Sequence, residues 1–295
     1  MIRKTMLAVA LMCAVTSASA ADNSHSNKTL SASEIVEKNI QARGGLSAWH
    51  AVQALSFEGK LGAGGNRRPT LPLPMPDKHL PSLTSAQRLP EEAQLPFKML
   101  MHRPRQVRFE IQFKGQTAFQ VFDGAHGWKM RPYLNRQDVE PFTADELKAA
   151  SLQPDLDGPL VDYAAKGTRV ELGGQEKVES RDTYKLTLTT KGGEKTHVWV
   201  DAQTFLETKV EGQPRRLDGK LHPVEVFYRD YRQVSGLQIP FILETRVLPN
   251  SDATAREKEV PLQAEKIVVE KVVVNPKLET AMFSKPEIQT ASSQR

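Results

Sequence analysis

The sequence predicts a mainly β fold of the α+β class, in which about ten antiparallel strands form one curled sheet with helices packed on it. The clearest observation is the stretch 181–212, where apolar and polar residues alternate through three successive strands separated by turns. A second is the alternation of Val107, Phe109, Ile111 and Phe113 with polar residues, which is typical of a half-buried strand. The helical patterns, by contrast, are few and short.

Residues 1–20 have the three parts of a secretory signal peptide. Arg3 and Lys4 precede an apolar run from Met6 to Val15, and the small residues at 18–20 precede Ala21. The apolar run is shorter than the roughly 20 residues that a membrane-spanning helix needs. We therefore expect cleavage before Ala21 and a periplasmic location.

Cysteine content and charge exclude two classes of protein. Cys13, the single cysteine, lies inside the apolar run, so the processed chain would have no disulfide and its stability would come from core burial. Without Arg3 and Lys4, 38 basic residues face 35 acidic ones. Because this excess is small, we expect no nucleic-acid partner.

The first elements follow from capping and stop signals. Ser31 or Ser33 is expected to cap a helix that extends through Arg43 and ends at a pair of glycines. A short turn around Trp49 then leads into a strand at 55–61.

The segment from Gly62 to Pro96 has a different composition. It contains seven prolines, at positions 69, 72, 74, 76, 81, 90 and 96. Proline removes a backbone donor and is excluded from helix interiors, so we interpret about 62–96 as a long, partly extended loop inserted between two strands.

The remaining elements are predicted from alternation and turn residues. Thr143 is expected to cap a helix at 144–151, and a second helical piece is expected at 160–165. Strands are expected at 97–102, 105–113, 118–122, 128–131, 169–172, 184–189, 197–200, 205–210, 224–232, 239–248 and 262–274.

Catalytic and metal-binding signatures are not found in the sequence. The seven histidines lack the spacing of metal ligands, and neither a GxSxG motif nor a processed-chain cysteine is present. Gly192-Gly193 is interpreted as a hairpin turn, since a strand follows where a phosphate loop needs a helix. Asp155, Asp157 and Asp162 could supply acid or base groups, but loop carboxylates are usually solvated or capping. We expect no enzyme activity, metal or cofactor.

Several short signatures occur in a fixed order along the chain. They are IVEKNIQARGG at 35–45 followed by Trp49, FDG at 122–124 with GW at 127–128, GPL at 158–160 before DY at 162–163, YKLTLT at 184–189 with VWVD at 198–201 and Thr204, YRQVSGLQIPF at 231–241, and NP at 275–276 with Phe283. Each describes turns and strands, and the ordered set spans nearly all of 21–288. In this order they resemble the family of outer-membrane lipoprotein-sorting proteins, the periplasmic lipoprotein carriers.

The resemblance implies a single domain at 21–288, followed by a flexible tail at 289–295. Its fold would be an unclosed antiparallel β barrel, with helices covering an apolar concave side that shields acyl chains from water. Each acyl CH₂ hidden from water contributes about 0.8 kcal/mol. The chain departs from compact carriers in its length and in its Pro69–Pro96 insertion. The resemblance is therefore equally compatible with a lipid carrier, a lipid sensor or an accessory of an envelope export system.

Three hypotheses about function follow. The leading one is a monomeric, non-catalytic carrier of lipoproteins or other lipids, working with an envelope transport protein. The alternatives are an interaction module whose proline-rich loop docks a protein, and a hydrolase built from scattered Asp, His and Ser residues. The helices either fill the concave side or cover a cavity there. The residues expected to line that cavity are Trp49, Phe109, Phe119, Val121, Trp128, Tyr184, Leu186, Val198 and Phe227.

Overall fold

The computed structural model describes residues 30–63, 93–132, 136–153, 155–217, 219–250 and 263–287. Its contacts divide the chain into Met1–Leu30 and Ser31–Arg295, and all described helices and strands belong to the second unit. The expected signal peptide, residues 64–92 of the proline-rich insertion and the tail at 289–295 lie outside the described residues. Predictions about these segments stay predictions.

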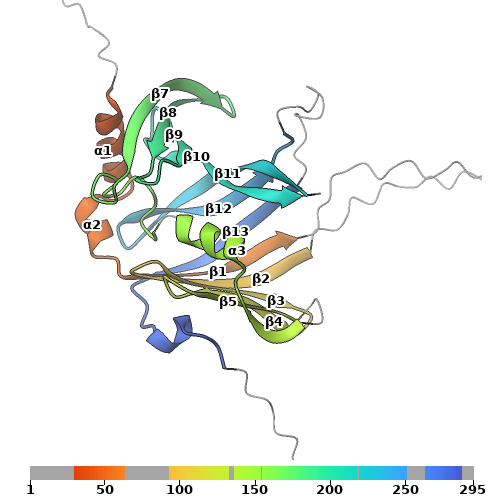
Figure 1. Cartoon of the computed structure of the whole chain (residues 1–295). Helices are drawn as coiled ribbons and strands as arrows, with labels where there is room; N and C mark the ends of the chain where they lie inside the picture. The colour runs from red at the N-terminus through yellow and green to blue at the C-terminus, as the bar shows by residue number, and fades with distance from the viewer. Residues whose placement is uncertain are drawn as a thin grey trace, which may run out of the picture. The chain divides into compact units, whose positions relative to one another are not determined.

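Thirteen strands form one antiparallel sheet in the order β6-β5-β4-β3-β2-β1-β13-β12-β11-β10-β9-β8-β7 (Figure 1). They are β1 (Ala54–Ala63), β2 (Ala93–His102), β3 (Gln106–Phe113), β4 (Gln116–Phe122), β5 (Gly127–Arg131), β6 (Arg136–Pro141), β7 (Arg169–Val178), β8 (Arg181–Thr189), β9 (Lys195–Asp201), β10 (Glu207–Leu217), β11 (Lys220–Val234), β12 (Leu237–Val247) and β13 (Gln263–Val274). Two meanders, β1–β6 and β7–β13, are thus joined where β1 pairs with β13.

The mainly β class and the antiparallel sheet are confirmed, but the strand count differs. The sheet has thirteen strands where about ten were expected, and β6 and β7 are the ends of an open sheet. Strand β6 escapes prediction because its sequence, RQDVEP, has no apolar alternation. Strand β2 begins at Ala93 and includes Pro96, so the loop inserted after β1 is shorter than 62–96.

Capping residues explain where the helices begin. Helix α1 (Ala32–Ala42) begins after Ser31, and α3 (Ala144–Leu152) after Thr143, each with a reciprocal capping box to a glutamate. Between them lies the short α2 (Leu46–His50). The helical piece expected at 160–165 is wrong, because the chain forms turns there and Asp162 has φ +50°, which a right-handed helix excludes.

The strand register separates two faces of the sheet. Directly paired residues of antiparallel strands point to the same side. We name the inner face by its apolar residues Leu55, Phe57, Leu61, Phe97, Met99, Phe109, Phe241, Leu243, Ile267 and Val269, which belong to one cluster. The outer face carries two other clusters, one around Phe119 and one around Phe227.

An ion pair shows that the sheet curls around the inner face. Arg215 of β10 donates two hydrogen bonds, of 2.7 and 2.9 Å, to the Glu265 carboxylate of β13. Strands β11 and β12 lie between them, so a flat sheet would separate the two backbones by roughly 14 Å. Val224 and Val247 in the intervening strands are 3% and 0% exposed. The bridge therefore covers part of the inner face.

The helices and one loop cover the other end of the same face. Trp49 of α2, together with Leu156 and Val161 from the loop after α3, packs with Leu55 and Leu237 in the main core cluster. Helix α1 buries Ile35 and Val36 completely, and its Asn39 side chain donates a 2.8 Å hydrogen bond to the Phe205 carbonyl before β10. Figure 1 shows α1 beside β7.

Candidate functional site: the inner face of the sheet

The centre of the inner face is apolar and only partly buried. Phe57 of β1 pairs with Met99 of β2, and Ile267 of β13 pairs with Leu243 of β12. Each of these four side chains is partly exposed, whereas Leu55 and Leu237, nearer the helices, are 2% and 1% exposed. The two pairs lie on β2, β1, β13 and β12, and Ile267 pairs with Leu61, four positions along β1 from Phe57. We call the four residues Phe57, Met99, Leu243 and Ile267 the central strip.

Charged groups on the inner face are neutralised by partners. Arg43 lies 3.2 Å from Glu207 and stacks over the Trp49 ring, 4.4 Å from its centroid. Lys129 of β5, only 3% exposed, donates to both oxygens of Glu146 in α3. Together with the Arg215–Glu265 bridge, these pairs leave a face that suits an uncharged apolar ligand.

Two tyrosines near the Arg43–Glu207 pair remain neutral over the physiological pH range. Burial raises the pKa of Tyr228 to about 12; the Glu207 charge adds to this rise and Arg43 opposes it. Burial and Glu207 also raise the pKa of Tyr231 well above its usual value. Its hydroxyl donates a 3.0 Å hydrogen bond to the Glu207 carbonyl. The phenols therefore add no charge to the inner face.

The nine residues predicted to line a cavity are divided between the two faces. Phe109, Tyr184, Leu186 and Val198 point to the inner face, and Trp49 packs at its helix end. Leu186 and Val198 are 0% and 1% exposed, so helix and sheet already fill that region.

The other four predicted residues point to the outer face. Phe119, Val121 and Trp128 pack under the C-terminal segment with Phe283, and Phe227 packs with Trp199. Conversely, the central strip was not predicted, although each of its residues alternates within a strand. Choosing the face required the register between strands, in particular the β1–β13 pairing.

Cations cover the outer-face aromatic pair. Lys209 Nζ lies 3.8 Å from the Trp199 ring centroid, and the Arg246 guanidinium lies 4.1 Å from the Phe227 centroid. Trp199 and Phe227 are consequently only 5% and 4% exposed. Cation–π contacts of this kind and the side-chain stems that make them keep water from the rings. This part of the outer face is already filled.

The aspartates considered for acid–base chemistry each have a polar side-chain partner. Arg103 bonds Asp155 at 3.0 Å and Asp157 at 2.8 Å, and the Asp162 carboxylate lies 2.6 Å from His50. Within the described ranges, no three His, Cys, Asp or Glu residues gather as metal ligands would. No described helix has the length and apolar character needed to cross a membrane.

Comparison with solved structures finds similar chains at low sequence identity. No protein-family model and no curated protein sequence matches the chain. A LolA superfamily protein from Nitrosomonas europaea is 14% identical, with a TM-score of 0.49 over 87% of this chain and 99% of that one. A DUF1329 family protein from Desulfovibrio piger is 13% identical, with a TM-score of 0.49 over 87% and 98%.

A third similar structure is an outer membrane lipoprotein-sorting protein domain from Vibrio parahaemolyticus. It is 14% identical, with a TM-score of 0.48 over 85% of this chain and 95% of that one. These similarities concern the fold alone.

Proposed function

We propose that the protein is a non-catalytic periplasmic carrier that holds the acyl chains of a lipid or lipoprotein against the central strip. The observation that carries this proposal is the set of partly exposed apolar side chains that Phe57, Met99, Leu243 and Ile267 place on the inner face. The signal-peptide pattern at 1–20 supports the location.

The energetics of the central strip favour a chain-like apolar ligand. Apolar surface removed from water contributes about 25 cal/mol per Å², and each buried CH₂ about 0.8 kcal/mol. Covering ten methylenes would therefore supply roughly 8 kcal/mol before the entropic cost of binding. No polar contact is required, which fits the paired charges around the strip. Delivery would then need a second protein or a membrane that competes for the chain.

A pair of adjacent substitutions tests this site. Leu243 points to the inner face and its neighbour Ile242 to the outer face, and both are partly buried. We expect Leu243→Trp to fill the strip and weaken binding of a fluorescent fatty acid on the order of tenfold, a loss of about 1.4 kcal/mol. Ile242→Trp is the matched control and should bind as the parent does.

The readout combines displacement of the fluorescent fatty acid with native mass spectrometry of the gently purified protein. Circular dichroism melts establish that both variants fold. Equal weakening by the two variants, or parent protein that binds no amphiphile, would refute the proposal. The interaction-module alternative depends on the proline-rich loop, which lies largely outside the described residues, and it stays a prediction.

A further inference from the structure

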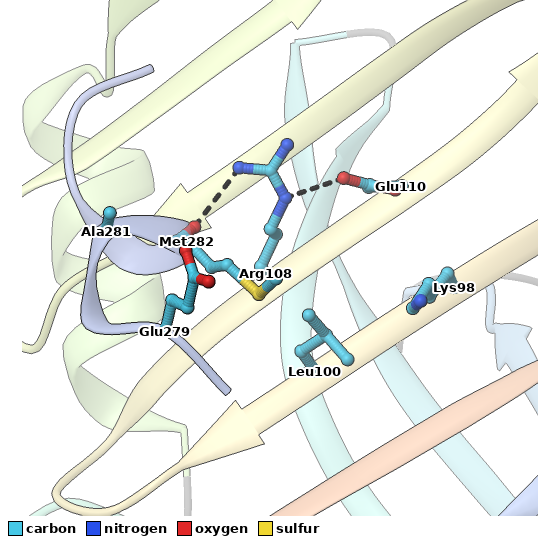
Figure 2. Close-up of a pocket in the computed structure, with 7 residues that line it drawn as sticks. All are labelled: Lys98, Leu100, Arg108, Glu110, Glu279, Ala281 and Met282. Carbon is cyan, nitrogen blue, oxygen red and sulfur yellow. Dashed lines mark hydrogen bonds and ion pairs between the residues drawn. The ribbon is translucent and has the colours of Figure 1, made fainter. Parts of the chain in front are cut away.

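A small pocket lies on the outer face, on the opposite side of the sheet from the central strip. Figure 2 shows it between β2, β3 and the C-terminal 3₁₀ turn η2 (Thr280–Phe283). It has a volume of about 360 Å³ and is lined by Lys98, Leu100, Arg108, Glu110, Glu279, Ala281 and Met282. Small-molecule pockets span roughly 300–1,000 Å³, so this one suits a compact ligand.

An aromatic anchor fixes the wall of this pocket. Phe283 is 1% exposed and packs with Leu100, Phe119 and Val121 beneath η2. The turn is therefore held on the sheet by a buried ring as well as by polar contacts. Because the wall is fixed before any ligand arrives, the pocket is preorganised.

Arg108 is held in place with one end available to a ligand. Its Nε donates a 2.6 Å hydrogen bond to Glu110, and its Nη1 donates one of 3.1 Å to the Met282 carbonyl. The guanidinium also lies 5.3 Å from the centroid of the Phe119 ring. Figure 2 shows the third nitrogen, Nη2, with no interaction drawn, and it hydrogen-bonds none of the described residues. A pinned guanidinium with a spare donor is well suited to an oxyanion.

Charged side chains of both signs line the pocket. Lys98 lies in the neighbouring strand and forms a 3.6 Å ion pair with Glu58, in which the two side chains are 46% and 42% exposed. Glu110 uses one carboxylate oxygen for Arg108, and the Glu279 side chain lies at the opposite wall. Leu100 supplies an apolar floor. A purely anionic or purely cationic ligand would meet two groups of its own sign.

We propose that this pocket binds a compact zwitterion in which a phosphate is joined to a primary ammonium group. The phosphate accepts from Arg108 Nη2 and Lys98, and the ammonium donates to Glu110 and Glu279. A primary ammonium has N–H donors for the carboxylates, whereas a quaternary ammonium has none. This chemistry is shared by free glycerophosphoethanolamine and by the headgroup of phosphatidylethanolamine in a membrane. The site is separate from the central strip.

Titration of the full protein with glycerophosphoethanolamine, followed by amide NMR shifts, tests the site. Shifts should gather in β2, β3 and η2, and Arg108→Gln should weaken binding at least tenfold. Arg136→Gln, which alters an arginine in β6 that is 55% exposed, is the matched control and should have no effect. Equal affinity in the Arg108→Gln protein, or no shifts in the parent, would overturn the proposal.

Because Arg108→Gln also removes a hydrogen bond to η2, a second variant is needed that leaves η2 in place. Glu279 is exposed and precedes η2, so Glu279→Gln leaves the buried anchor intact. It should weaken binding of glycerophosphoethanolamine severalfold and leave binding of glycerol 3-phosphate unchanged. If glycerol 3-phosphate or ethanolamine alone binds the parent as tightly as the zwitterion, the proposal is wrong.

Vesicle flotation distinguishes the two sources of the ligand. Binding to phosphatidylethanolamine vesicles but not phosphatidylcholine vesicles, lost in Arg108→Gln, assigns the pocket to a membrane headgroup. Glycerophosphoethanolamine binding without flotation assigns it to the free compound. Displacement of the fluorescent fatty acid should be unchanged in Arg108→Gln, so the pocket and the carrier proposal can fail independently.

Discussion

Asp157 links three separate parts of the chain at the helix end of the inner face. Its carboxylate is 1% exposed and accepts hydrogen bonds from Arg103 Nη2 at 2.8 Å and from Lys166 Nζ at 2.5 Å. Its backbone carbonyl accepts a 2.9 Å hydrogen bond from Arg43, which also pairs with Glu207. A buried carboxylate is tolerated only with such partners.

Removing this charge should destabilise the fold. Asp157→Asn leaves Arg103 and Lys166 without their shared partner, and we expect a loss of about 2–3 kcal/mol, below the 3–5 typical of fully buried pairs because both cations are partly exposed. Urea denaturation measures it. Asp182→Asn, whose ion pair with Lys177 is 71% exposed on both sides, should change stability by under about 1 kcal/mol. Similar losses in the two variants would contradict the role assigned to Asp157.

At the residue scale, the sequence identified the loop aspartates but not the cations that pair with them. Asp155, Asp157 and Asp162 stood out as loop carboxylates. Lys166 lies nine positions from Asp157, but Arg103, which pairs with both Asp155 and Asp157, lies 52 and 54 positions away. Nothing in a local pattern connects Arg103 with these aspartates, so a structural network and an acid–base pair look alike in the sequence.

At the scale of elements, α3 differs from the other helices in how it is attached. It has no buried residue. In its N-terminal turn, Glu146 accepts a hydrogen bond from Lys129 of β5. At its C-terminal end, Arg105, which directly precedes β3, donates a 2.9 Å hydrogen bond to the Gln153 carbonyl. Because polar contacts dominate, its attachment should respond to pH more than to apolar substitutions.

Acid should release α3 before the sheet unfolds. Burial opposes ionisation of Glu146, but hydrogen bonds from Lys129 and Thr143 prevail and hold its pKa below the ordinary value of 4.5. A lowered pKa contributes stability that is complete above about pH 4.5 and is lost as the pH falls through the folded-state pKa. Amide hydrogen exchange should therefore show α3 opening as the pH falls below about 4.5. Glu146→Gln should open α3 at neutral pH as well; unchanged protection of α3 in that variant would refute the ion-pair attachment.

Gly59 shows how one position shapes a strand pair. It sits at the bulge where β1 shifts register against β13, and a Cβ there would lie 2.1 Å from the Val268 carbonyl oxygen. Gly59→Ala must push β13 away, and we expect a loss of about 3 kcal/mol or more in thermal unfolding.

Gly173 is the matched control, since it adjoins a bulge in the edge strand β7 and a Cβ at this position would stay 3.2 Å or more from every neighbour. Gly173→Ala should cost less than about 1 kcal/mol. If the two alanine variants lose the same stability, the close approach of β13 does not explain why position 59 is glycine.

At the scale of the whole molecule, the sequence predicts strands well and their assembly poorly. Alternation in β3 and β4 identifies both Phe109 and Phe119 as apolar strand residues. Only the register shows that these two side chains point to opposite faces. The β1–β13 pairing joins residues more than 200 positions apart, such as Leu55 and Val274. Because short-range patterns carry no information on such pairings, the predicted lining mixed the two faces.

The inner face combines a filled region with an open one. Helices and loops bury the end around Trp49, the Arg215–Glu265 bridge covers another part, and the central strip between them stays partly exposed. This answers in part whether the helices fill the concave side or only cover it. The helices and loops fill only the end around Trp49, and the centre is left as the surface on which an acyl chain is proposed to lie.

Photo-crosslinking with a diazirine-labelled fatty acid tests that central claim most directly. After irradiation of the full protein, peptide mass spectrometry should find the label on β1, β2, β12 and β13 at residues of the central strip, with competition by unlabelled fatty acid. Leu243→Trp should reduce the yield and Ile242→Trp should not. Label confined to the outer face, or spread over both faces without competition, would contradict the carrier proposal.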